Sequence, residues 1–303
     1  MSKVLITGGA GFIGKAVARK LKKEGLNVVT FDILEPKEKI GRHYLGTIMY
    51  VDELEKAMEG CTYVIHLAAM LGVKRTETNR TGCLDVNIHG TKNVFDACRN
   101  AKIKKIIFAS SSEVYGEPIK NPISENDFVM PKSVYAVTKL VGEEYARAYK
   151  QEYGLDYSIV RFFNAYGPDQ TPEFVVPRFV RSVMNNESPT VYGRGNQERC
   201  FCHVNDTARG VYLALKNPKA SGEIFNIGNS TTKITTADLA RKIIAISGKK
   251  LKPEFIDMKD SDRTKEREII QRIADTRKAQ KILGFKAEIN LEEGIRDIFE
   301  KNF

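Results

Sequence analysis

Tyr135 and Lys139 lie four residues apart in a segment, residues 133–153, that reads as a long helix behind Pro131. Residues i and i+4 share one face of a helix, so the ammonium group of Lys139 is expected beside the phenol of Tyr135. A neighbouring cation favours the phenolate and lowers the pKa of a tyrosine. Such a tyrosine can take the proton of an alcohol while a nicotinamide takes the hydride. A bare Tyr-x-x-x-Lys often occurs by chance, so the rest of the chain must supply the context.

A glycine-rich turn near the N-terminus supplies part of that context. It follows the apolar run of residues 4–6, which is typical of a strand buried on both faces, and it precedes a helical pattern. Gly9, Gly11 and Gly14 match the dinucleotide fingerprint, in which glycines allow a tight turn, close approach of a pyrophosphate and close packing of helix on strand. The helix N-terminus adds free N–H groups for the phosphates. The residues expected to hold the dinucleotide here are Gly8, Gly11, Phe12, Ile13 and Gly14.

A second predicted strand, residues 28–31, ends at Asp32. A carboxylate in that position can accept hydrogen bonds from the adenosine ribose hydroxyls, and it would repel a 2′-phosphate. Lys37 and Lys39 lie close enough to weaken this preference. The sequence therefore predicts NAD, rather than NADP, as the cofactor.

Strand-like and helical segments alternate through the first half of the chain. Further strands are expected at residues 63–67, 105–109 and 157–161, and helices at residues 86–99 and 133–153. This alternation predicts an α/β fold with a Rossmann-type doubly wound parallel sheet. Loops lengthen after Gly167-Pro168, and a helix is expected at 175–184, which indicates a smaller α/β substrate-binding domain. The expected division is residues 1–165 for NAD binding and 166–303 mainly for the substrate, with some later segments returning to the sheet.

Composition narrows the class of protein. The chain has 303 residues, a formal net charge of +10 and five cysteines without metal-ligand spacing, so we expect no metal site. It has no apolar run of about 18 residues, and its first strand begins too early to leave room for a signal peptide. We therefore expect a cytoplasmic protein with no membrane partner. Basic and acidic residues are interleaved from 249 to 286, which favours a solvated surface over a nucleic-acid site.

Seven motifs, taken together, point to one family. In chain order they are Gly8-Gly9-Ala10-Gly11-Phe12-Ile13-Gly14, His66-Leu67-Ala68-Ala69, Ser110 to Gly116, Tyr135-x-x-x-Lys139, Arg161 to Pro168, Gln197 to Asp206 and Phe225-Asn226-Ile227-Gly228. The series resembles the extended short-chain dehydrogenase/reductase family, and within it the NAD-dependent nucleotide-sugar epimerases and dehydratases. The resemblance covers nearly the whole chain.

The resemblance implies roles for individual residues. Ser111 looks like the serine or threonine that hydrogen-bonds the sugar 4-hydroxyl, Tyr135 like the base, and Lys139 like its tuner and a ribose ligand. Ala68 and Asn87 are expected along the path of NAD. The implied substrate is a nucleotide-diphosphate sugar, and the residues expected to contact it, besides Ser111, are Asn164, Val176, Arg199 and Arg267, with Arg263 as an alternative to the last.

The resemblance leaves the reaction open between several outcomes. A 4-epimerase that forms a 4-keto intermediate on a UDP-sugar is the leading expectation. Glu113 resembles a glutamate of dehydratases and of UDP-glucuronate decarboxylases, where it lies near C5, so those reactions are the second. Net oxidation at C4 is a third, and a non-catalytic NAD- or RNA-binding relative is a fourth. The resemblance also implies a homodimer that pairs the helices around residues 89–99 and 133–153.

Overall fold

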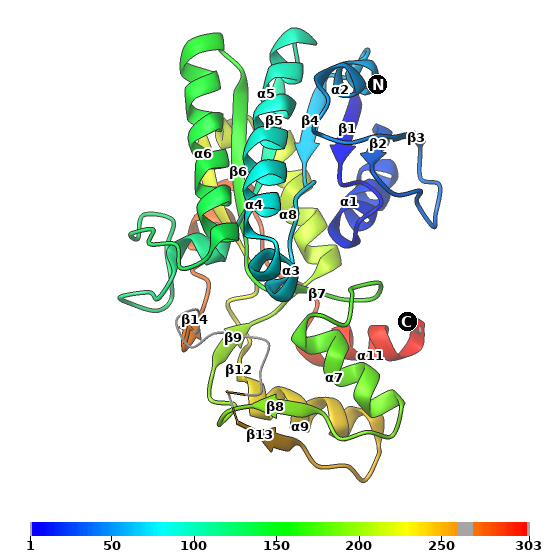
Figure 1. Cartoon of the computed structure of the whole chain (residues 1–303), viewed down its shortest axis with the longest axis vertical. Coiled ribbons are helices and arrows are strands. Elements are labelled where there is room, and N and C mark those ends of the chain that lie inside the picture. The colour runs from blue at the N-terminus through cyan, green and yellow to red at the C-terminus, as the bar shows by residue number, and fades with distance from the viewer. Residues whose placement is uncertain (1, 258, 260–268, 302–303) are drawn as a thin grey trace.

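The structure is a computed structural model that describes residues 2–257, 259 and 269–301. Within those residues, seven parallel strands form the central sheet in the order β11-β6-β5-β4-β1-β2-β3 (Figure 1). The strands are β1 (Lys3–Thr7), β2 (Asn27–Asp32), β3 (Arg42–Leu45), β4 (Tyr63–His66), β5 (Lys105–Ser111), β6 (Asp156–Phe162) and β11 (Glu223–Ile227). The strand order reverses at β1, which lies between β2 and β4. The predicted Rossmann-type doubly wound parallel sheet is confirmed.

Helices cover both faces of this sheet because its strands are apolar on both sides. Val4 and Ile6 of β1 pack into one core and Leu5 into the other, as the two-residue period of a strand requires. The first face is covered by α1 (Phe12–Lys23), α8 (Val204–Lys216) and α10 (Arg277–Leu283). The second is covered by α2 (Val51–Met58), α5 (Gly90–Asn100) and α6 (Val134–Tyr153) (Figure 1).

A smaller group of elements lies beyond the carboxyl ends of the central strands (Figure 1). It contains α7 (Val175–Met184), α9 (Thr236–Ser247), α11 (Leu291–Lys301), β8 (Thr190–Tyr192), β9 (Glu198–Cys200), β12 (Lys233–Thr235), β13 (Glu254–Ile256) and β14 (Gln271–Arg272). Phe179, Leu239 and Ile295 belong to its separate core. Later segments also serve the large sheet, because β11 pairs with β6 and α10 packs beside it. The division at residues 165 and 166 remains an interpretation of the sequence.

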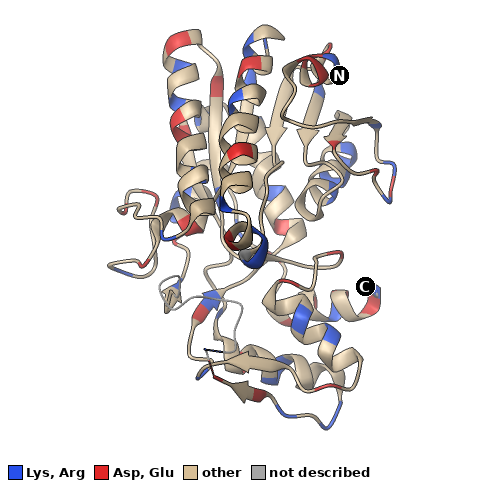
Figure 2. Ribbon diagram, viewed as in Figure 1, with Lys and Arg blue, Asp and Glu red and all other residues tan. Residues whose placement is uncertain are grey.

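Seven further elements are short. They are α3 (Val73–Thr78), α4 (Arg80–Leu84), η1 (Asp85–His89), η2 (Ser112–Tyr115), η3 (Pro218–Ala220), β7 (Ala165–Tyr166) and β10 (Cys202–His203). Lys15 Nζ on α1 forms an ion pair of 2.8 Å with Asp169 Oδ2, which links α1 to the loop after β7. No helix of the described residues combines the length and the apolar character that crossing a membrane needs. Figure 2 shows Lys and Arg interspersed with Asp and Glu along the ribbon.

The helix expected at residues 86–99 is not a single α-helix. Residues Asp85–His89 form a π-helical turn before α5 begins. Within that turn, Asn87 Oδ1 accepts a hydrogen bond of 2.7 Å from the backbone N–H of Met70, and Asn87 Nδ2 donates one of 3.0 Å to its carbonyl oxygen. Turns of this kind are frequent at functional sites, and periodicity does not reveal them.

Candidate active site

The carboxyl ends of the central strands and the smaller part of the molecule enclose a cavity of about 820 Å³. Its lining includes these residues that the sequence singled out: Gly8, Gly11, Phe12, Ile13, Gly14, Asp32, Ala68, Ser111, Glu113, Tyr135, Lys139, Asn164, Val176 and Arg199. They come from segments far apart in the chain. The parallel sheet brings those of the first half to one edge, and Val176 and Arg199 come from α7 and β9 of the smaller part. Arg267 and its alternative Arg263 lie outside the described residues.

The glycine turn after β1 is packed so closely that Gly8 and Gly14 leave no room for a side chain. Gly8 has a φ of +72°, and a Cβ on it would lie 2.7 Å from the backbone nitrogen of Ala68 after β4. A Cβ on Gly14 would overlap the carbonyl oxygen of Gly8. The turn lies at the point where the strand order reverses, and its glycines line the cavity.

The Tyr135–Lys139 pair lies on the first turns of α6, beside the end of β5. Ser133 starts the helix by accepting a hydrogen bond of 3.0 Å from the backbone N–H of Ala136. The ammonium nitrogen of Lys139 donates to the carbonyl oxygen of Ala109 at 2.8 Å and lies 5.6 Å from the centroid of the Tyr135 ring. Ser111, the last residue of β5, lies beside Tyr135, and its hydroxyl is close enough to lower the pKa of the phenol.

The electrostatics of this group differ from the expectation that Lys139 makes Tyr135 acidic. Burial raises the pKa of the Tyr135 phenol, and the negative charge of Glu113 raises it further. The neighbouring Ser111 hydroxyl and the positive charge of Arg272 oppose that rise. Burial lowers the pKa of Lys139 to about 8. The lysine donates to a backbone carbonyl, and burial together with Glu113 determines a direction that helical spacing does not predict.

Polar residues at the other end of the cavity are already engaged with the protein. Asn164 Nδ2 donates to the carbonyl oxygen of Cys200 at 2.8 Å, and Asn164 Oδ1 accepts from Arg272 Nη2 at 3.1 Å. Arg199 Nη2 donates to the carbonyl oxygen of Ile269 at 2.7 Å. These bonds fix the directions of two side chains for which the resemblance implies diphosphate contacts.

Asn87 does not belong to the lining, in contrast to its expected place along the path of NAD. Only 3% of its surface is exposed, and its side chain is used to hold the backbone of Met70, which does line the cavity. Sequence analysis also missed Arg178, whose guanidinium lies 4.6 Å from the centroid of the Tyr192 ring on the cavity wall. Its one signal was its position two residues after Val176 in a correctly predicted helix.

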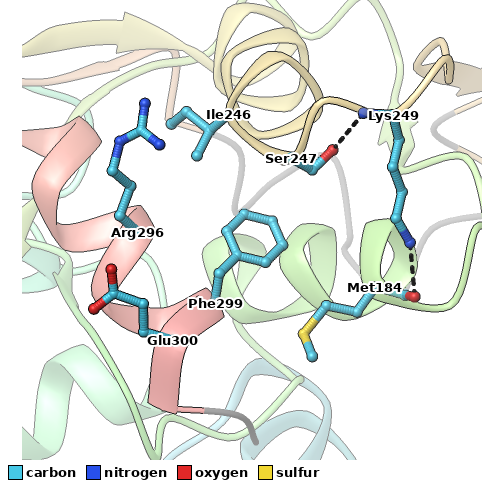
Figure 3. A pocket seen from close by; sticks show the side chains of 7 residues that line it. All are labelled: Met184, Ile246, Ser247, Lys249, Arg296, Phe299 and Glu300. Carbon is cyan, nitrogen blue, oxygen red and sulfur yellow. Dashed lines mark hydrogen bonds between the residues drawn. The ribbon is translucent and has the colours of Figure 1, made fainter.

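A second hollow of about 360 Å³ lies between α7, α9 and α11 (Figure 3). Its charged groups serve the helices themselves: Lys249 Nζ donates to the carbonyl oxygen of Met184 at 2.9 Å, and Arg296 pairs with Glu292 at 2.8 Å. It holds none of the predicted site residues. The chemistry of the chain therefore belongs to the larger cavity.

Comparison with known proteins agrees with this arrangement. The sequence profile of the NAD dependent epimerase/dehydratase family matches residues 4–228, which include both the glycine turn and the Tyr135–Lys139 pair. The chain belongs to the NAD-dependent epimerase/dehydratase family.

Members of this family with known names cover the whole chain. A UDP-N-acetyl-alpha-D-glucosaminuronate decarboxylase of Bacillus cytotoxicus is 32% identical over 98% of this chain and 97% of its own. The crystal structure of UDP-glucose 4-epimerase from Thermotoga maritima with UDP-glucose has a TM-score of 0.91 at 30% identity, covering 99% of this chain and 98% of its own. That of UDP-glucuronic acid 4-epimerase from Bacillus cereus with UDP-glucuronic acid and NAD has a TM-score of 0.90 at 30% identity, with the same coverage.

The residues of this epimerase/dehydratase fit the NAD on which the family depends. Helix α1 begins at Gly11 without a side-chain cap and without an acidic residue in its first turn, so its N–H groups and positive end are available to a pyrophosphate. Asp32 ends β2 at the cavity, where its two oxygens accept from the backbone N–H groups of Ala10 and Leu34 at 3.0 and 3.1 Å. These bonds hold the carboxylate in the place where ribose hydroxyls would meet it.

The Lys139→Met variant tests whether burial lowers the pKa of Lys139, through the pH dependence of the free energy of unfolding. Its pKa of about 8 lies below its ordinary value of 10.5. Between these values the unfolded chain holds the proton and the folded protein has released it, so the contribution of Lys139 to the free energy of unfolding rises with pH. We expect the wild type to gain stability over Lys139→Met between about pH 8 and pH 10.5, by up to about 1.4 kcal/mol per pH unit.

Urea unfolding of both proteins at several pH values in this interval measures that difference. Lys250→Met removes a positive charge from an exposed position and serves as the control. A stability difference that stays constant or falls with rising pH would contradict the buried cation.

Proposed function

We propose that this protein is an NAD-dependent 4-epimerase of a UDP-sugar, acting through a 4-keto intermediate. The observation that carries the proposal is that Ser111 and Tyr135 line one cavity together with the glycine turn and Asp32. Relatives named as UDP-sugar 4-epimerases match the chain over its whole length and support the same reaction.

In this proposal Tyr135 and Ser111 act on the sugar hydroxyl at C4. The phenolate form of Tyr135 takes the hydroxyl proton, and Ser111 holds the same oxygen by a hydrogen bond. NAD, held by the glycine turn and Asp32, would supply the acceptor and donor of the C4 hydride, whose return to the opposite face of the ring gives the epimer. Lys139 keeps a positive charge beside the tyrosine and offers donors to a ribose. Tyr135 returns the proton, so no atom is gained or lost over the cycle.

The far end of the cavity suits the nucleotide diphosphate. Arg199 and Arg178 line it on two sides, and guanidinium groups match phosphate oxygens with paired donors. Val176 supplies apolar wall between them. We therefore place the diphosphate near Asn164 and Arg199, and the base against α7.

A decarboxylase or dehydratase is the second candidate, and Glu113 favours it. This carboxylate lines the cavity close enough to Tyr135 to raise the pKa of the phenol, and its Oε2 accepts a hydrogen bond of 3.1 Å from Ser133. A carboxylate so placed can serve as a base toward C5 of the sugar. A relative named as a decarboxylase supports this second candidate.

Glu113→Gln distinguishes the two candidates. The amide keeps the size of the side chain but cannot act as a base, so a dehydratase should lose activity by about 10²-fold or more. An epimerase should keep the same product, with a rate within about tenfold of the wild type. Turnover and product identity are read by chromatography of the nucleotide sugars. A variant with unchanged rate and product rules Glu113 out as a catalytic base.

The proposed function itself is tested by mass spectrometry after incubation with UDP-, GDP- and dTDP-sugars, UDP-glucuronate included. A new isomer of unchanged mass supports epimerisation. Loss of water or carbon dioxide would select the second candidate, and loss of two hydrogens a net C4 dehydrogenase. No product from any sugar would contradict all three and favour a non-catalytic relative.

We also propose a homodimer in the cytoplasm. Val137 is exposed on the outer face of α6, where the resemblance places a partner helix. All five cysteines are buried and free, as suits a reducing compartment. Light scattering should give about twice the 34.1 kDa of one chain.

A further inference from the structure

Side chains of α6 contact successive residues at the end of β5. Its Lys139 ammonium donates to the carbonyl oxygen of Ala109, and its Tyr135 lies beside Ser111. The residue between those two on the strand is also held from the same helix, by Glu143.

Glu143 lies one turn beyond Lys139, so the three side chains share one face of α6 at four-residue spacing. The hydroxyl of Ser110 donates a hydrogen bond of 2.6 Å to Glu143 Oε1. Neither residue has a part in the proton and hydride transfer proposed above, yet Ser110 directly precedes Ser111. Two consecutive residues of β5, Ala109 and Ser110, are thus bound by successive turns of α6, and Ser111 follows them beside Tyr135.

A fully buried carboxylate needs a compensating charge, and Arg161 of β6 supplies it. Arg161 Nε and Nη2 donate to the two oxygens of Glu143 at 2.8 and 2.6 Å, and both side chains are at most 3% exposed. Arg161 Nη1 continues to Tyr115 Oη at 2.9 Å, and that hydroxyl donates to Asn226 Oδ1 at 2.7 Å. The paired geometry leaves the carboxylate little freedom to move.

Stability alone accounts poorly for this arrangement. Taking both charges of a buried pair out of water offsets most of their attraction, and apolar residues of the same size often stabilise a protein as well. What the pair provides instead is a fixed position, because two donors from β6 and one from β5 converge on the same carboxylate. Its position in turn fixes where Ser110, and hence the next residue of the strand, lies relative to α6.

We propose that Glu143, oriented by Arg161, is a positioning residue that sets the place of Ser111 relative to Tyr135 by holding Ser110. The inference rests on the proposed roles of Ser111 and Tyr135. It assigns the ion pair no contact with substrate or cofactor.

Ser110→Ala is the test, because it removes the hydrogen bond to Glu143 and leaves the ion pair intact. The matched control is Ser158→Ala: Ser158 is also fully buried in the sheet, and its hydroxyl donates to the carbonyl oxygen of Ala220, away from the cavity. Both variants lose one buried hydrogen bond, so similar losses of thermal stability are expected. Only Ser110→Ala should lower kcat, by about tenfold or more, with KM for the sugar nucleotide changing less than about threefold.

The pH profile of kcat gives a readout that a purely structural role would not move. The neighbouring Ser111 hydroxyl lowers the pKa of the Tyr135 phenol, so displacing Ser111 in the Ser110→Ala variant should move the rise of kcat with pH to higher pH. Equal kcat and equal profiles in the two alanine variants would overturn the inference. A Tyr135→Phe variant with full turnover would instead overturn the proposed chemistry, so the two failures are distinct.

Discussion

Tyr135→Phe is expected to lower kcat by about 10²- to 10⁴-fold, the range that one positioned acid–base group contributes. The phenyl ring fills the same place on α6 but cannot take the proton of the 4-hydroxyl. The protein should remain folded and keep NAD, because the glycine turn and Asp32 are untouched. Turnover is measured with the sugar that the product screen identifies, and bound NAD by its release on denaturation.

Tyr149→Phe is the matched control for this prediction. Tyr149 lies on the same helix, and its hydroxyl donates a hydrogen bond of 2.7 Å to Asp96, outside the cavity lining. The Tyr149→Phe variant loses a buried hydroxyl, as Tyr135→Phe does, but its kcat should stay within about threefold of the wild type. Equal losses of turnover in the two variants would mean that the Tyr135 hydroxyl has a structural role rather than a chemical one.

Gly14→Ala is expected to destabilise the protein by about 1–3 kcal/mol or more and to abolish NAD retention. The added Cβ would overlap the carbonyl oxygen of Gly8 and come within 2.8 Å of Gly9 Cα. Both obstacles are backbone, so the turn must open and α1 must move away from the sheet. Thermal unfolding and NAD content of the purified variant measure the two effects.

Gly11→Ala separates binding from folding in the same turn. Gly11 has a φ of −72°, which alanine adopts freely, and a Cβ there would lie 3.1 Å from the carbonyl oxygen of Gly8. The variant should fold with a small loss of stability, yet bind NAD about tenfold or more weakly, because its methyl group enters the approach of the pyrophosphate. A Gly14→Ala variant as stable as Gly11→Ala would show that helix packing does not require the third glycine.

The sequence was sufficient for the central sheet and insufficient at its margins. Buried strands such as β1 and β5 are apolar on both faces, and the helices between them are amphipathic, so period alone located them. Strand β3 (Arg42–Leu45) escaped prediction because it lies at the sheet edge and is only partly buried. The π-turn around Asn87 escaped for a different reason: it depends on contacts with Met70, 17 residues away.

The sequence by itself determined which residues can do chemistry here, because a glycine turn, an acid after the second strand and a Tyr-x-x-x-Lys pair are local patterns. Only the tertiary structure decided how these groups behave. Burial and the charge of Glu113 set the direction of the Tyr135 pKa, against the expectation from helical spacing. The bonds that join Glu143 to Ser110 and Arg161 span 33 and 18 residues. Desolvation and long-range hydrogen bonds exist only in the folded chain, and no local pattern encodes them.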